Sequence, residues 1–475
     1  MIDSASRPLG SSPADAVAGK RRRRESVLVS LILGVPLVLF AISLFLVRPL
    51  SLGETFSLML LAPGLLIVGL LTVRIPRSYF LSSLGRVGIE FALLTLIVAL
   101  SILSLVNSEE PLRSFRIVYP SVLPMAIFAH LVVVAYLAPE RLAKIPRLLI
   151  VCAFVFSVGP LFLSMAVPPL KAHLFGEYRF RGMFENSIQH SIALATIVPL
   201  VVVQFITARA GARKLAWGLA LLVFAYTAFR AGSKTAMFVG FAGGAMLYVV
   251  LALRTRSFLK IGIMVAVMGL LAFVVWTRGL AIAEMINPVT AEKLRTIIEG
   301  GVANYQSIES RKELWSTAID EGRRHWIVGT GAGEKVLGIS HAHNLVLDYF
   351  KGIGFFGASA IVLLCVTILA RTGGKTLSVL AGRGNERDIR ILACYFGASV
   401  YVICNQLSDC FGPSTIGFLW LPYLAGRLME RGRPDVGPQS FATGSRVRDV
   451  APGPDSAGAD AATGAEAELG APSQN

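Results

Sequence analysis

Apolar runs long enough to cross a membrane recur along most of the chain, and this pattern limits its fold more than any other feature. A helix of about 20 apolar residues spans a hydrocarbon core about 30 Å thick. The hydrophobic fraction of 54% and the mean hydropathy of +0.66 agree with a membrane protein. We therefore predict an all-α fold, a polytopic membrane bundle of about 12 transmembrane helices with one large external helical loop. The predicted spans are Val27–Val47, Phe56–Val73, Val87–Val106, Val118–Leu137, Leu148–Val167, Ser191–Thr207, Leu215–Phe229, Thr235–Leu253, Ile261–Trp276, Gly352–Ala370, Ile391–Leu407 and Ile416–Met429.

The segments between these runs differ in charge, and the difference predicts the topology. Cytoplasmic loops of membrane proteins carry an excess of Lys and Arg. If the amino terminus is inside, every inner loop has at least three such residues, and both termini are cytoplasmic. The same pattern accounts for the net charge of +16, so no nucleic-acid partner is expected. The inner-loop residues are Arg74, Arg77 and Arg86; Arg141, Lys144 and Arg147; Arg209, Arg213 and Lys214; Arg254, Arg256 and Lys260; and Arg371, Lys375, Arg383, Arg387 and Arg390.

Three parts of the chain follow from this reading. Residues 1–26 are predicted to form a disordered cytoplasmic tail, and residues 27–430 a transmembrane domain whose external loop covers about 277–343. Residues 431–475 are rich in Gly, Ala, Pro and Ser, and such a composition cannot bury a core. We predict a second disordered cytoplasmic tail there.

Polar groups that can carry chemistry gather on the predicted outer side. His130 falls in the middle of a span, whereas the other five of the six histidines lie on the outer side or at its boundary: His173, His190, His325, His341 and His343. Imidazoles also tolerate membrane interfaces, but five on one face favour a site there. The outer loops contain no D-x-D pair or carboxylate cluster suited to Mg²⁺. The five cysteines lack metal-ligand spacing.

The stretch "SIESRKELWSTAIDEGRRHW" predicts a helix in the large outer loop. Ser310 followed by Glu313 fits a capping box, so the helix is predicted to begin at Ser310. Its buried stripe is then predicted to consist of Leu314, Trp315, Ala318 and Ile319. Arg311 would occupy the first helical position, where its guanidinium adds to the positive end of the helix dipole and suits phosphate oxygens. The alternative is an arginine that snorkels from an interfacial helix.

Two further outer segments admit a functional and a structural interpretation. In "RFRG", Arg179 and Arg181 lie close to a span and are expected to point in different directions, so that only one faces a site; ordinary loop charge is the alternative. The glycines of "VGTGAGEKV" could form an anion-binding nest, but a turn linking two helices is favoured. Asp348 and Lys351 are three residues apart on a predicted helix and are expected to pair structurally.

Several of these stretches together resemble the O-antigen ligase and Wzy-type polymerase superfamily. "HAHNLVLDYFKGIGFFG" resembles its H-x-H-N motif, and "SRKELWSTAIDEGRRHWIVGTGAG" resembles the segment before that motif. "RFRGMFENSIQHSIALATIVPL" resembles an earlier arginine loop, and "FRAGSKTA" an element that opens a later span. The resemblance implies an undecaprenyl diphosphate-linked glycan as donor. The glycan would pass to an acceptor sugar with inversion, without metal or cofactor, at the outer face of a bacterial inner membrane.

The resemblance also implies roles for particular residues. His343 would assist the acceptor hydroxyl, and Arg311 would stabilise the diphosphate. Either Arg179 or Arg181 would match the family's first-loop arginine. A positive group that steadies the departing diphosphate and an imidazole that accepts a proton fit such a transfer.

Three positions complete the set that the resemblance implies. Lys234 in "FRAGSKTA" would contact the diphosphate, while His341 and Asn344 would support the site. The family commonly has an asparagine after a proline or a lysine behind the first-loop arginine; this chain departs from that pattern with "ENSIQHS", so the resemblance assigns no role to Asn186.

The motifs leave the exact activity open between two enzymes and a transporter. A ligase acts on a lipid A-core acceptor and a polymerase of exopolysaccharide or O-antigen acts on a growing glycan, but they share the motifs. A transporter or flippase of lipid-linked glycan would place polar groups near the membrane midplane. Glu90, toward the inner half of the third predicted span, is the residue that such a transporter would use. A membrane scaffold accounts for the spans but leaves the outer Arg and His residues unexplained.

Overall fold

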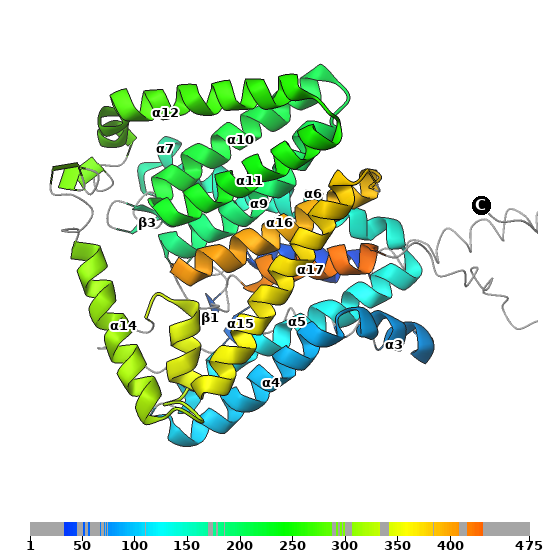
Figure 1. Ribbon diagram of the computed structural model, residues 1–475, viewed down its shortest axis with the longest axis vertical. Helices are drawn as coiled ribbons and strands as arrows, with labels where there is room; N and C mark the ends of the chain where they lie inside the picture. The colour runs from blue at the N-terminus through cyan, green and yellow to red at the C-terminus, as the bar shows by residue number, and fades with distance from the viewer. Residues whose placement is uncertain are drawn as a thin grey trace, which may run out of the picture. The chain divides into compact units, whose positions relative to one another are not determined.

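The computed structural model is almost entirely helical (Figure 1). The chain divides into two units, Met1–Glu430 and Arg431–Asn475, and every described residue belongs to the first. The tails predicted at 1–26 and 431–475 lie outside the described residues. The structure describes residues 33–44, 51–52, 56–57, 67, 71, 73, 75–109, 111–169, 174–176, 179–184, 186–286, 291–292, 295–296, 298–299, 306–332, 342–382, 384–407 and 416–430.

Helices connected by short turns make up the described part, and two short hairpins interrupt them. Antiparallel pairs form between β1 (Ser51–Leu52) and β2 (Phe56–Ser57) and between β3 (Phe175–Gly176) and β4 (Arg179–Phe180). The helices are α3 (Arg77–Arg86), α4 (Gly88–Ser104), η1 (Leu105–Asn107), α5 (Pro111–Leu137), η2 (Pro139–Lys144), α6 (Ile145–Ala153), the π-helical η3 (Phe154–Val158), α7 (Gly159–Ala166), α9 (Ser187–Thr207), α10 (Gly211–Ala231), α11 (Lys234–Arg254), α12 (Phe258–Ile286), α14 (Gln306–Arg324), α15 (Leu345–Leu380), α16 (Glu386–Leu407) and α17 (Ile416–Met429).

Seven helices of the described part are long and apolar enough to cross a membrane, so this is a multi-pass membrane protein. They comprise 88–107, 139–166, 187–207, 211–231, 235–254, 345–380 and 386–406, and three shorter apolar helices cover 33–44, 122–137 and 416–429. The prediction of an all-α polytopic bundle is confirmed. The last predicted span coincides with α17, whereas most of the predicted span 56–73 lies outside the described residues.

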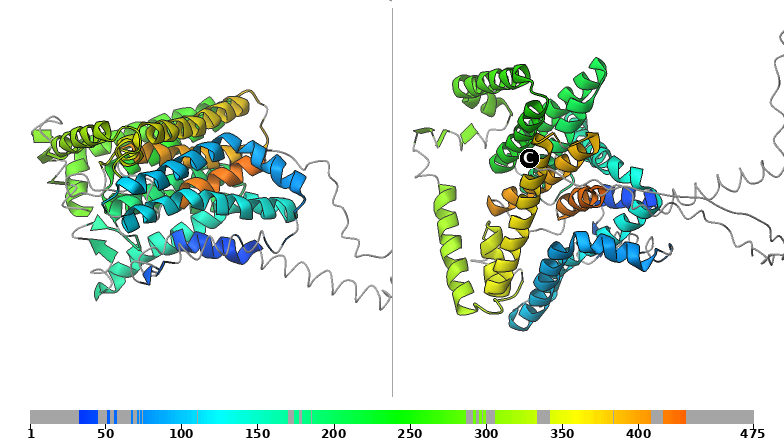
Figure 2. Two further views of the ribbon diagram at one scale, coloured as in Figure 1. Left: turned by 90° about the horizontal axis from the view of Figure 1, so that it is seen from below. Right: turned by 45° about the vertical axis from the view of Figure 1, so that its right-hand side comes forward.

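The core of the bundle surrounds α9, which is buried along most of its length and packs against α10, α11 and α16 (Figures 1 and 2). Glycines allow the close approach. A Cβ placed at Gly240 of α11 would lie 2.7 Å from the Cα of Ala195, and one at Gly397 of α16 would lie 2.8 Å from the carbonyl oxygen of Thr196. Membrane helices associate through such small residues because lipid supplies no hydrophobic driving force between them.

The long helix α15 is broken near its start, and the glycine-rich segment after α14 closes the break. Ile353 and Gly354 have non-helical dihedrals, with φ of +77° at Gly354. At this break the carbonyl oxygens of Lys351 and Gly352 accept hydrogen bonds from the N–H groups of Thr330 (2.9 Å) and Gly331 (3.1 Å). Because these N–H groups are used inside the fold, the described residues 329–332 form the predicted turn rather than an anion-binding nest.

Candidate active site

Helix α14, which carries the first predicted site residue, Arg311, packs against α15. Leu314 and Ala318 form its buried stripe, as predicted, and pack with Ala342. The prediction that the helix begins at Ser310 is wrong, because α14 already begins at Gln306. Arg311 therefore lies in the second turn, with its side chain partly buried, and the expected help from the helix N-terminus is not available to it.

The segment before α15 fixes the backbone around His343. The indole Nε1 of Trp315 donates a hydrogen bond to the carbonyl oxygen of Ala342 at 2.9 Å. The N–H of Ala342 donates to Oδ1 of Asp348 at 2.6 Å. His343 follows with φ of +54°, a left-handed conformation that is uncommon for a residue with a side chain, and its imidazole is partly buried.

Asn344 begins α15 as its N-cap. Its Oδ1 accepts a hydrogen bond from the N–H of Leu347 at 3.1 Å, and its backbone carbonyl accepts one from the N–H of Asp348 at 2.9 Å. Asn344 thus caps α15 directly after His343, which fits the supporting role predicted for it. His341 lies outside the described residues.

Arg311 and His343 are linked through Trp315. Residues four apart on a helix share a face, so Arg311 lies one turn from Trp315 on the same side of α14. Trp315 in turn holds the residue that precedes His343. Trp315 therefore joins α14, which carries Arg311, to the backbone that leads into His343.

The hairpin β3–β4 carries the other two predicted arginines. Gly176 pairs with Arg179, and Phe175 pairs with Phe180. Phe180 is fully buried, whereas Arg179 and Arg181 on either side of it are partly buried. Alternate residues of an extended segment share a face. This alternation gives no support to the expectation that the two arginines point in different directions, but β4 ends at Phe180 and the direction of the Arg181 side chain stays a prediction.

Arg230 joins this hairpin, although the sequence did not single it out. Its guanidinium lies over the ring of Phe175, 5.3 Å from the ring centroid. Arg230 lies in the last turn of α10. Gly232, with φ of +74°, caps this helix, and α11 begins two residues later at Lys234. The side chain of Lys234 lies outside the described residues. The available signal was an arginine at the outer end of an apolar span, four residues before that lysine.

The remaining outer histidines divide by environment. His190 is fully buried beneath the hairpin, in T-shaped contact with Phe180 at 5.1 Å and against Phe184 at 5.3 Å between ring centroids. His325 is exposed just after α14. His343 differs from both of them, because Trp315 and Asp348 bind the residue before it and Asn344 caps α15 directly after it. Asn186 caps α9, because its Oδ1 accepts a hydrogen bond from the N–H of Gln189 at 2.8 Å.

Lys351 and Asp348, predicted to pair with each other, both contact other segments. Lys351 is 2% exposed, and its Nζ lies 3.6 Å from Oε2 of Glu321 on α14. Asp348 binds the backbone of Ala342. Both contacts tie the first turns of α15 to the region that precedes it.

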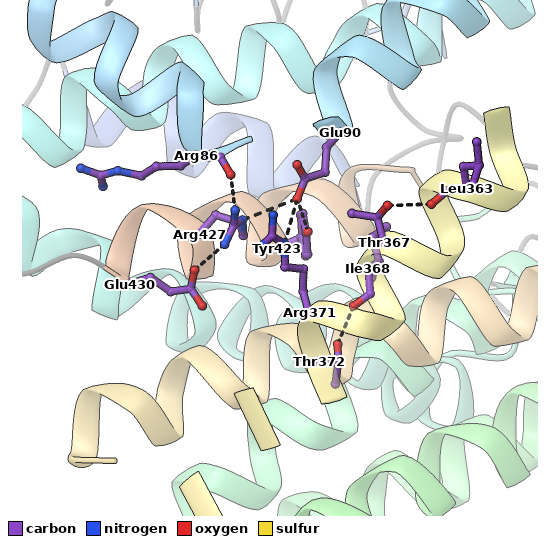
Figure 3. A network of polar contacts seen from close by, with 10 residues as sticks. All are labelled: Arg86, Glu90, Leu363, Thr367, Ile368, Arg371, Thr372, Tyr423, Arg427 and Glu430. Carbon is purple, nitrogen blue, oxygen red and sulfur yellow. Dashed lines mark hydrogen bonds and ion pairs between the residues drawn. The ribbon is translucent and has the colours of Figure 1, made fainter. Parts of the chain in front are cut away.

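A second polar cluster surrounds Glu90 in the first turn of α4 (Figure 3). The hydroxyl of Tyr423 donates to Oε1 of Glu90 at 2.7 Å, and Nε of Arg427 lies 3.6 Å from the same oxygen. Arg427 also binds Glu430 and the carbonyl oxygen of Arg86. Glu90 and Arg427 are buried. The residue that a transporter would use is thus part of an ion-pair network between α4 and α17.

Among the residues that the structure describes, no three His, Cys, Asp or Glu side chains gather as ligands for a metal ion. The described cysteines, Cys152, Cys365, Cys394 and Cys404, are buried and unpaired with one another.

The fold is that of a multi-pass membrane protein, and arginines and a histidine lie near the ends of its helices. Residues 218–362 match the family model described as O-antigen ligase (Wzy_C), a family of membrane glycosyltransferases, so the chain carries a domain of this family and the resemblance seen in the sequence is confirmed. The match includes Arg230, Lys234, Arg311 and His343 and begins after the hairpin arginines. No curated protein gives a significant match to the chain.

Proposed function

We propose that this protein transfers a glycan from an undecaprenyl diphosphate carrier to an acceptor sugar, as an O-antigen ligase-like enzyme of the bacterial inner membrane. The reaction inverts the anomeric centre and needs neither metal nor cofactor. The observation that carries the proposal is the contact of Trp315 with Ala342, which links the face of Arg311 to His343 within the matched family domain.

The chemistry follows from the residues. A hydroxyl of the acceptor sugar attacks the anomeric carbon, the bond from that carbon to the diphosphate oxygen breaks, and the hydroxyl proton passes to the imidazole of His343. Negative charge accumulates on the departing diphosphate. The Arg311 guanidinium, with Arg179, Arg181 and Lys234, stabilises that charge, and such preorganised groups act more strongly away from bulk water.

We further propose twelve membrane crossings with both termini in the cytoplasm and the site on the periplasmic side. Contacts between helix ends support this arrangement. At one end, Asn107 after α4 donates to the carbonyl oxygen of Gly329 (3.0 Å), and Arg230 in the last turn of α10 stacks on Phe175. At the other end, Arg254, the last residue of α11, binds the carbonyl oxygen of Gly384 between α15 and α16. Each group contains only ends that an alternating topology assigns to one side.

Transfer by the purified protein in lipid, with a defined polyprenyl diphosphate glycan, tests the proposal. General acid–base assistance typically contributes about 10²–10⁴-fold, so H343A should lower the transfer rate by about that factor. R311A should lower it strongly, and R311K should restore only part of the rate because lysine lacks the forked donor geometry. R323A is the matched control, since Arg323 lies exposed on the same helix. Unchanged transfer by an R311A/H343A double variant would rule out both assignments.

The polymerase is the second candidate, because the matched family shares its chemistry between acceptors. Offering a lipid A-core acceptor and a second repeat unit in parallel separates the two activities. Transfer to the lipid core alone identifies a ligase, and extension of the repeat unit alone identifies a polymerase. Accumulation of lipid-linked glycan on the cytoplasmic side of cells that lack the protein, with no transfer by the purified protein to either acceptor, would instead favour the transporter or flippase.

A further inference from the structure

We propose that Trp315 and Asp348 are positioning residues that set the orientation of His343 for proton transfer. The inference rests on the proposed function, in which His343 accepts the proton of the acceptor hydroxyl. Neither side chain needs to touch substrate. Each binds one side of Ala342, the residue immediately before the histidine.

The two contacts fix the peptide planes on both sides of Ala342. The carbonyl oxygen that Trp315 holds belongs to the same planar peptide unit as the N–H of His343. The N–H that Asp348 holds belongs to the preceding peptide unit. With the peptide plane before His343 fixed, the direction in which the histidine side chain leaves the backbone depends on the φ of His343.

His343 needs such support because its own backbone conformation is unfavourable. Its φ of +54° brings Cβ close to the following carbonyl, a conformation that residues other than glycine adopt infrequently. Residues in sparsely populated regions keep their conformation only where the surrounding structure holds them, and such residues cluster at functional sites. Asn344 supplies the restraint on the other side by starting α15 directly after the histidine.

The two hydrogen bonds to Ala342, one from Trp315 and one to Asp348, form a clamp. This clamp also couples His343 to the proposed diphosphate site. Trp315 belongs to α14, one turn after Arg311, and Asp348 belongs to the first turn of α15. The Lys351–Glu321 ion pair, at 3.6 Å, joins the same two helices further along. These contacts oppose a shift of α14 relative to α15 and so keep the helix that carries Arg311 in a fixed position relative to the His343 backbone. This is useful for a base that must act on one side of the sugar while the diphosphate leaves from the other.

Substitutions that remove one of the two hydrogen bonds to Ala342 test the clamp, and a shape-conserving variant accompanies them. W315F keeps a large ring and loses the indole N–H. D348A loses the acceptor, whereas D348N keeps an oxygen that can accept from the N–H of Ala342. We expect W315F and D348A to lower kcat by about 10-fold to 100-fold, because small misplacements of a catalytic group are costly. KM for the lipid-linked donor should stay within about twofold, and D348N should retain most of kcat.

W326F and D320A are the controls. Trp326 is 54% exposed, and Asp320 lies exposed on α14, where it pairs loosely with Arg323 at 3.8 Å. Both variants should keep wild-type kcat. Melting temperature and elution profile in detergent show whether each variant is folded. If W315F does not fold, the comparison of D348A with D348N decides the question.

A double-mutant cycle separates positioning from general stabilisation. If Trp315 acts through His343, W315F should cause no further loss in single-turnover rate once H343A has removed the imidazole. Equal fold losses in the two backgrounds, or wild-type kcat in W315F and D348A, would overturn the positioning role and leave the proposed function intact. A wild-type rate for H343A would overturn the proposed role of the histidine and this inference with it. If the H343A rate lies below detection, the split between kcat and KM and the recovery in D348N decide.

Discussion

Replacing Glu90 tests whether the buried network of Figure 3 is structural, as the contacts indicate, or part of a transport path. Glu90 is fully buried, and its Oε1 accepts the hydroxyl of Tyr423 at 2.7 Å and lies 3.6 Å from Nε of Arg427. In E90A these two partners lose this oxygen, and so does Arg371, whose Nε lies 4.0 Å from it. Arg427 keeps Glu430 and the carbonyl of Arg86, so its charge is only partly uncompensated.

The contacts set the expected size of the effect. Removing one partner of a buried ion pair costs about 3–5 kcal/mol. Because Arg427 keeps other partners, we expect E90A to lower the free energy of unfolding by about 3 kcal/mol, the lower end of this range. E90Q keeps an oxygen for Tyr423 and loses the charge. The difference between charged and neutral hydrogen bonds then predicts a cost of about 1–1.5 kcal/mol. E386A, which removes an exposed i,i+4 pair with Arg390, should cost less than about 0.5 kcal/mol.

Denaturant titration of the purified protein in detergent measures these free energies, and transfer assays on the folded fraction measure function. We expect the order E90A, E90Q, E386A in decreasing destabilisation, with the transfer rate per folded molecule within about twofold of wild type. Wild-type stability of E90A would refute the structural reading of the network. Full stability of E90Q with transfer abolished would show that the carboxylate has a functional role in the transfer reaction.

Three further predictions follow from local geometry. G354A should destabilise the protein by at least about 1 kcal/mol in a thermal or denaturant melt, because φ is +77° and the added Cβ would lie 2.3 Å from the carbonyl oxygen of Ile327. G373A is the control: no atom lies within 4 Å of its added Cβ, so this variant should be neutral or stabilised by up to about 1 kcal/mol. R230A should raise KM for the lipid-linked donor about threefold to tenfold in steady-state assays, because the arginine stacks beside the hairpin that carries Arg179 and Arg181; an unchanged KM would remove Arg230 from the diphosphate site. Incubation with a chelator should leave the transfer rate unchanged, and loss of activity that added Mg²⁺ or Mn²⁺ restores would contradict the metal-independent reaction.

Local patterns in the sequence were sufficient for the helices and for some of their ends. Apolar length predicted a polytopic bundle, and the last predicted span matches α17 residue for residue. Hydropathy works well here because a lipid-spanning backbone must satisfy its own hydrogen bonds, which leaves helices as the main solution. The buried stripe of α14 was likewise visible from its periodicity. The capping box at Ser310 misled, because a Ser followed three residues later by Glu also occurs inside a helix.

The candidate site was predictable as a set of residues but not as an arrangement. Arg311 and His343 were named from motifs, whereas the clamp on Ala342 joins Trp315 and Asp348 across segments that no local pattern relates. Arg230 reaches the hairpin only because α10 packs beside it.

The polar partners of buried groups were decided by tertiary structure alone. The sequence determined that Glu90 and Lys351 would be charged groups within or beside apolar helices, and the high cost of burying a charge required that each find a partner. It did not determine the partners. Tyr423 and Arg427 reach Glu90 from α17, and Glu321 reaches Lys351 from α14. The physical reason is that local propensity acts over a few residues, whereas the pairing of buried charges depends on which helices lie side by side.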